Sequence, residues 1–170
     1  MSDKLSIAAI NAMDRAAFVA RFGGVYERSP WVAEQAWGAR PFAGRMALEQ
    51  AMQEVVRTSG RQRQLELIGL HPRLGTRLKL SGYSREEQSG AGLLNAAPEE
   101  LEELARLNAA YEARFGFPFI LAVRSASVRQ ILDSCRARID HAAASEFDES
   151  LRQVFRIAHF RLSDLVDDGV

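Results

Sequence analysis

The chain has 170 residues, and its 22 lysine and arginine residues equal its 22 aspartate and glutamate residues, so the formal net charge is zero. This length predicts a single domain over residues 1–170, and a hydrophobic content of 47% predicts a sizeable core. The neutral balance argues against nucleic-acid binding, because proteins of that class usually carry a surplus of basic residues.

Cysteine use and hydropathy exclude further classes. Cys135 is the only cysteine, which excludes an internal disulfide and a cysteine-rich metal site. The first ten residues, MSDKLSIAAI, contain no apolar stretch of signal-peptide length, and the last four, DDGV, match no peroxisomal signal. No segment reaches the roughly 18 apolar residues of a membrane span. We therefore expect a cytoplasmic protein with no membrane segment.

Helical patterns begin near the N-terminus. DRAAFVARFGG (residues 14–24) predicts a short helix with Asp14 as its N-cap. SPWVAEQAW (residues 29–37) predicts a second helix, with Ser29 at the cap and Pro30 at the first helical position, where its missing N–H costs nothing.

A longer helix and an irregular stretch follow. GRMALEQAMQEVVRTSG (residues 44–60) carries an apolar stripe of helical period, and Gly60 can close the helix. Residues 61–83 contain three glycines and a proline, so at least part of that stretch is expected to be loop. Another helix is expected to begin at Ser84.

The second half repeats the helical pattern. Three amphipathic segments, at residues 98–116, 125–140 and 145–166, predict helices, and Ser127 with Gln130 forms a capping box in the second of them. FPFILAV (residues 117–123) is a short apolar run that fits a buried strand or a buried helical turn, but no second strand-like run accompanies it. The fold class predicted is therefore all-α, a single-domain bundle of about eight helices.

Generic catalytic motifs are absent, and the three histidines are far apart in sequence, which argues against a metal enzyme. Cys135 lies mid-helix among apolar residues and is expected in the core. His71 stands out, because Pro72 forces residue 71 out of the α region, so that the imidazole is presented from a non-helical backbone. Such a histidine can act as an acid or base near neutral pH, or can simply be a hydrogen-bonded loop residue.

Two further segments carry open alternatives. In SREEQ (residues 84–88), Ser84 and Glu87 have the spacing of a capping box, although a helix N-terminus facing a cleft would also favour an anionic ligand. In RFGFPFILAVR (residues 114–124), the irregular apolar backbone needs hydrogen-bond partners, and a ligand is one candidate. Arg124 at its end can be a surface residue or an anion contact, and the surface position is favoured.

Together these motifs change the interpretation. Three of them occur in order: His71-Pro72, then Ser84-x-x-Glu87-Gln88, then Asn108-x-x-Tyr111-x-x-Arg114 followed by FGFPF. In this arrangement the chain resembles the family of 2-oxo-4-hydroxy-4-carboxy-5-ureidoimidazoline (OHCU) decarboxylases, which perform the last step from urate to (S)-allantoin. SPWVAEQAW, RPF and RIAHFRL extend the resemblance over essentially the whole chain.

The resemblance implies a role for each matching residue. His71 would be the catalytic histidine and Glu87 its partner at the substrate. The substrate-binding residues it implies are Pro72, Ser84, Gln88, Phe119, Ile120, Leu121, Ala122 and Val123, the last five largely through their backbone. It also implies an all-helical fold, a homodimer, OHCU as the small-molecule substrate, and neither a cofactor nor a metal.

One position departs from the family pattern. The commoner sequence reads His-Pro-Asp-Leu, whereas this chain has Arg73 in place of the aspartate. An acid-to-base exchange beside the catalytic histidine can shift its pKa or alter substrate contacts. Two alternatives therefore stay open: a paralogous decarboxylase of a related ureido-imidazoline, and a non-enzymatic helical module that binds a partner protein.

Overall fold

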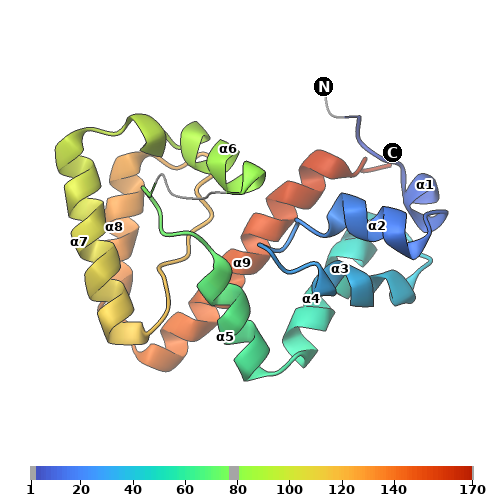
Figure 1. The fold of residues 1–170 in the computed structure, drawn as a ribbon, viewed down its shortest axis with the longest axis horizontal. Helices are drawn as coiled ribbons and strands as arrows, with labels where there is room; N and C mark the ends of the chain where they lie inside the picture. Colours follow the sequence, from blue (N-terminus) through green and yellow to red (C-terminus); the bar gives the residue numbers. More distant parts are fainter. Residues whose placement is uncertain (1–2, 77–80, 170) are drawn as a thin grey trace. The chain divides into compact units, whose positions relative to one another are not determined.

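The computed structural model describes residues 3–76 and 81–169. Within them it has nine α-helices, two 3-10 helices and no strand, which confirms the all-α prediction (Figure 1). The helices are α1 (Ile7–Asn11), α2 (Arg15–Phe22), α3 (Trp31–Ala36), η1 (Trp37–Ala39), α4 (Arg45–Thr58), α5 (Arg61–Leu70), α6 (Gly82–Gly90), η2 (Leu93–Asn95), α7 (Pro98–Phe115), α8 (Val128–Arg138) and α9 (Ala143–Leu165). None of the described helices is both long enough and apolar enough to cross a membrane.

The helices form two compact units. The first unit contains the residues up to 67 and those from 155 onward, and the second unit contains residues 68–154. Helices α5 and α9 each contribute to both units. Every residue that the sequence singled out for the site belongs to the second unit.

The core of the first unit is built by α2, α3 and α4, with α3 packed against both of the others. Phe18, Leu48 and Met52 are completely buried. Asp14 accepts a hydrogen bond from the N–H of Ala17 at 2.8 Å, which confirms its predicted role as the N-cap of α2.

The two chain ends of the first unit are joined by an isolated bridge. The N–H of Leu5 donates to the carbonyl of Leu165 at 2.9 Å, and the N–H of Asp167 donates to the carbonyl of Leu5 at 2.9 Å. A buried ion pair, Arg161 with Glu27 at 2.9 Å, lies in the same unit.

The second unit is organised around α7 and α8, which lie side by side (Figure 1). Tyr111 of α7 is buried, with its ring centroid 5.3 Å from that of Phe119. The predicted capping box of α8 is confirmed, since Ser127 and Gln130 exchange two hydrogen bonds of 3.1 and 2.8 Å. Cys135 is buried on α8, as its predicted core position requires.

One predicted cap in the first unit is wrong. Ser29 does not cap α3; its hydroxyl donates instead to the carbonyl of Glu27 at 2.8 Å, and Pro30 occupies the cap position. The physical reason is burial: Ser29 is 1% exposed, so its hydroxyl takes the carbonyl available within its own turn.

Candidate functional site

His71 lies immediately beyond the last residue of α5. Its N–H still donates to the carbonyl of Ile68 at 3.2 Å, but the helix ends at Leu70, as a following proline requires. His71 is only 7% exposed. The sequence therefore places a buried imidazole at the start of a loop, at the position that Pro72 fixes.

The loop that follows His71 is held by side chains from two helices. Asn108 of α7 donates through Nδ2 to the carbonyl of Leu74 at 3.0 Å. Gln88 of α6 accepts through Oε1 from the N–H of Gly75 at 3.0 Å. Both side chains are buried, so these bonds are shielded from water and fix the backbone that carries His71.

Gly75 allows this loop to approach α7 closely. Its φ of +82° lies in the left-handed region, and a Cβ at this position would stand 2.9 Å from Cδ2 of Leu104. A residue with a side chain would therefore meet both backbone strain and a buried neighbour.

Arg73 is paired with a side chain of α7. Its guanidinium forms a bidentate ion pair with Glu112, through Nε to Oε2 and through Nη2 to Oε1, the second at 2.8 Å. The hydrogen bond to Glu112 raises the pKa of Arg73. The base that replaces the commoner aspartate therefore has its own counter-ion, and the pair is a second bond between the loop and α7, after that of Asn108.

Helix α6 begins earlier than the sequence predicted. Ser81 is its N-cap and accepts from the N–H of Ser84 at 3.1 Å, so the helix starts at Gly82. The predicted capping box of Ser84 and Glu87 is wrong, because Ser81 already accepts from the first turn and leaves Ser84 inside the helix.

The polar residues of α6 therefore need another explanation than capping. Ser84 and Gln88 are one turn apart on the same face and are both buried, with 4% and 2% exposure. Glu87 is half-buried beside them. Three polar side chains therefore share the inner side of a short helix.

The segment from Phe117 to Val123 has no regular secondary structure and connects α7 to α8. Phe119, Ile120 and Val123 are buried, whereas Leu121 and Ala122 are partly exposed. Arg124 is exposed, in agreement with its predicted surface position.

A buried ionic network beneath this segment was not predicted from the sequence. Arg138 of α8 and Glu146 of α9 form an ion pair, with Nε 2.6 Å from Oε1, and Tyr111 donates its hydroxyl to the same carboxylate. Burial and the bond to Glu146 raise the pKa of Tyr111, which therefore remains a donor. The available signal was periodicity: Arg138 continues the buried stripe of Ile131 and Cys135 on α8.

A pocket of about 300 Å³ adjoins the His71 loop within the second unit. Its walls come from the loop and from one face of α7, and the lining residues include Leu74, Thr76, Leu101, Ala105 and Asn108. Oδ1 of Asn108 is buried and has no hydrogen-bond partner among the described residues. Asn108 is therefore one of the polar residues of the lining, together with Arg73 and Thr76.

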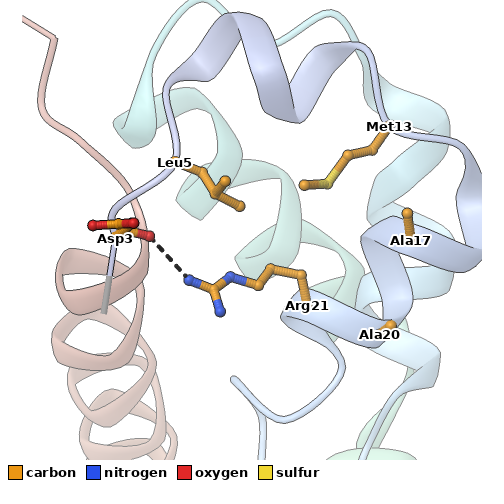
Figure 2. Close-up of a pocket in the computed structure, with 6 residues that line it drawn as sticks. All are labelled: Asp3, Leu5, Met13, Ala17, Ala20 and Arg21. Carbon is orange, nitrogen blue, oxygen red and sulfur yellow. Dashed lines mark hydrogen bonds between the residues drawn. The ribbon is translucent and has the colours of Figure 1, made fainter. Parts of the chain in front are cut away.

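A second pocket, of about 590 Å³, belongs to the first unit (Figure 2). In Figure 2 the guanidinium of Arg21 points across an apolar floor towards the carbonyl of Asp3, 3.4 Å away. None of the predicted site residues lines it. Among the residues that the structure describes, no group of three or more histidine, cysteine, aspartate or glutamate side chains is placed to hold a metal ion.

Comparison with known proteins assigns the chain to a family. Residues 11–163 match the family model described as OHCU decarboxylase. The chain belongs to the OHCU decarboxylase family. A 2-oxo-4-hydroxy-4-carboxy-5-ureidoimidazoline decarboxylase from Halalkalicoccus jeotgali is 42% identical over 162 residues, which cover 95% of this chain and 92% of that protein.

Two solved structures share the fold of this family member. The crystal structure of (S)-allantoin synthase superposes with a TM-score of 0.75 at 30% identity; the match covers 95% of this chain and 54% of that one, so this chain spans about half of it. A crystal structure of OHCU decarboxylase in the presence of (S)-allantoin gives a TM-score of 0.65 at 20% identity, covering 78% of this chain and 88% of that one. The second likeness is one of fold alone.

The described contacts bring part of the candidate site together. They join the loop that begins at His71 to α6 through Gln88, and they place the 119–123 segment over α8 and α9. A common cleft shared by His71, Glu87 and the 119–123 segment stays a prediction.

Proposed function

We propose that this chain catalyses the decarboxylation of OHCU to (S)-allantoin and CO2, the last step of urate oxidation to allantoin. The observation that carries the proposal is the family match over residues 11–163, together with 42% identity to a protein of that name across nearly its full length. The reaction is that of a carboxy-lyase.

The chemistry explains why no cofactor is proposed. The substrate carries a carboxylate and a hydroxyl on one ring carbon beside a C=N bond. When the bond to the carboxylate breaks, CO2 leaves, the electron pair forms a C=C bond to the neighbouring carbon, the π pair of the C=N bond moves to its nitrogen, and that nitrogen takes a proton. The hydroxyl then loses its proton as the carbonyl forms, and the neighbouring carbon gains a proton on one face. The substrate thus supplies the electron sink for which other decarboxylations use a cofactor.

Proton transfer and orientation are what the protein must provide. We propose His71 as the acid–base group and Glu87 as its partner at the substrate, because a histidine paired with a carboxylate suits proton transfer near neutral pH. Ser84 and Gln88 would orient the ureido arm or the ring carbonyls, Pro72 would line the site, and residues 119–123 would contact the substrate mainly through their backbone. The buried His71 and the polar inner face of α6 support these roles.

We further propose a single functional domain over residues 1–170, a homodimer and a cytoplasmic location. Family resemblance supports the homodimer. Light scattering coupled to size-exclusion chromatography would report about twice the 18.9 kDa chain mass for a dimer.

The structure weakens the alternative of a protein-binding module. A capping box would have explained Ser84 and Glu87 without any catalytic role, but the residue that caps α6 is Ser81. The alternative of a related ureido-imidazoline substrate was based on the exchange of aspartate for Arg73. The charge of Arg73 is paired with Glu112, so the exchange has an explanation other than a different substrate.

The direct test generates OHCU from urate with the two upstream enzymes and follows allantoin by circular dichroism. We expect the protein to accelerate OHCU decay and to bias the product to the S form. His71→Ala should lose at least about a hundredfold in kcat, the usual contribution of an acid–base group. His159→Ala, which removes a half-exposed histidine of the first unit, is the matched control and should retain activity. If wild-type protein leaves both the decay rate and the stereochemistry unchanged, the proposal is wrong.

A further inference from the structure

Two side chains hold the backbone of the Phe117–Val123 segment from one side. Arg138 of α8 donates through Nη1 to the carbonyl of Ile120. Gln153 of α9 accepts through Oε1 from the N–H of Ala122 at 3.0 Å. These bonds go to residues two apart, which is the spacing at which the peptide groups of an extended chain face the same side.

Arg138 is itself fixed in position. It is 5% exposed, its Nε donates to Glu146, and its guanidinium lies 4.6 Å from the centroid of the Phe119 ring. A buried ion pair contributes little net stability, because desolvation offsets most of the attraction. Its main consequence here is geometric. The fixed guanidinium holds the carbonyl of Ile120 in one position through its hydrogen bond.

The amide of Gln153 is oriented by a second carboxylate. Its Nε2 donates to Oε1 of Glu149 at 2.8 Å, so its oxygen must face Ala122. Burial raises the pKa of Glu149, but hydrogen bonds from Gln153 and Arg152 outweigh it and lower the pKa below its usual value. Glu149 therefore stays ionised at neutral pH and keeps the amide in one orientation.

Leu121 lies between the two anchored residues, and anchoring of residues two apart from one side is the pattern of an extended chain. In an extended chain the N–H and C=O of Leu121 point opposite to those of Ile120 and Ala122. Among the described residues, the Leu121 backbone has no hydrogen-bond partner, and the residue is only partly buried. It therefore presents a donor and an acceptor side by side.

We propose that Gln153 and Arg138 are positioning residues, which hold the peptides of Ala122 and Ile120 so that the N–H and C=O of Leu121 are presented to a ligand. Such a pair complements an –NH–C(=O)– edge, as found in a cyclic amide or a ureido group. The inference rests on the proposed function for its assignment of the 119–123 backbone to the substrate.

The decisive variant is Gln153→Met, which keeps the length of the side chain but removes the acceptor. Loss of one positioning hydrogen bond, about 1 kcal/mol, corresponds to a rise of about fivefold in KM for OHCU. We expect kcat to change less than about twofold, since the acid–base groups are untouched. Exchange of the Ala122 amide proton, measured by NMR, should become about fivefold faster or more. Gln50→Met, at an exposed glutamine of α4, is the control and should change neither quantity.

A double variant separates positioning from mere structure. Exchanging the pair, Glu149→Gln with Gln153→Glu, preserves the donor–acceptor order: the new amide donates to the new carboxylate, which accepts from Ala122. KM and the exchange rate should return to within about twofold of wild type. If Gln153→Met leaves both unchanged, or if the exchanged pair fails to restore them, the inference is overturned. Absence of any OHCU turnover in wild-type protein would instead refute the proposed function, and the exchange of the Ala122 amide would still test the positioning.

Discussion

Gly75→Ala tests the close packing of the His71 loop on α7. Two costs add at this position. A left-handed φ of +82° costs a residue with a Cβ about 1–2 kcal/mol. The new Cβ would also stand 2.9 Å from Cδ2 of Leu104, which is 1% exposed and cannot swing into solvent, so overpacking adds about 1–3 kcal/mol. The expected loss is thus about 2–5 kcal/mol in the free energy of unfolding.

Two other glycines of the second unit separate these contributions. Gly116 has a similar φ of +79° but nothing within 4 Å of a Cβ, so Gly116→Ala should cost the backbone contribution alone. Gly69 lies inside α5 with open space around it, so Gly69→Ala should stabilise by about 0.5–1 kcal/mol. Urea denaturation followed by circular dichroism gives all three values. If Gly75→Ala costs no more than Gly116→Ala, the close approach to Leu104 is refuted.

Three further predictions concern single contacts. Arg73→Gln should lower stability by less than about 1 kcal/mol in urea denaturation, since its pair with Glu112 is at the surface, and should leave kcat within about twofold; a large loss of kcat would show that Arg73 serves the site directly. Ser81→Ala should lower the free energy of unfolding by about 1 kcal/mol, because it removes the N-cap of α6. Ser84→Ala should instead raise KM with little loss of stability. The reverse pattern would show that Ser84, not Ser81, caps the helix. Burial raises the pKa of Cys135 to about 11, so its thiol should resist iodoacetamide at pH 8 until the protein is unfolded, and a fast native reaction would contradict its buried position.

The same shift fixes the sign of one pH effect. A thiol whose pKa is higher in the folded than in the unfolded state contributes stability that is fully present below the unfolded value of about 8.5 and is lost as the pH rises towards 11. The burial of Cys135 should therefore contribute to a fall in the free energy of unfolding as the pH rises in alkaline solution. Cys135→Ala should make that fall with pH less steep.

Much of the fold was predictable because its signals are local. Asp14, the Ser127–Gln130 box and the glycine that ends α7 are side chains or backbone positions acting within one turn. The two failures have separate causes. Ser29 and Ser84 both satisfied a local capping pattern, but burial redirected the first, and Ser81, an equally good cap three residues earlier, displaced the second.

The site was predictable only in part, because its supports are long-range. Local patterns single out His71 and the 119–123 segment, but only the resemblance gives them a role at the substrate, since neither carries a generic motif. Gln153, by contrast, accepts a hydrogen bond from Ala122, which is 31 residues away in the sequence, and no local pattern predicts such a contact. Its neighbours on α9 alternate charged and apolar residues, which by itself predicts only a solvated helix face.

Gln88 shows how the structure narrows a role that resemblance leaves broad. Resemblance assigns it to the substrate, yet its side-chain oxygen accepts from Gly75 and so holds the loop that begins at His71. Its two N–H donors then remain for a ligand that presents an acceptor there. OHCU offers carbonyl and carboxylate oxygens, so under the proposed function one buried amide would both fix the backbone that carries His71 and orient the substrate beside it. Gln88→Glu keeps an oxygen that can accept from Gly75 but removes the N–H donors, so it should affect the substrate and spare the loop. Gln88→Ala removes both groups and cannot separate the two roles.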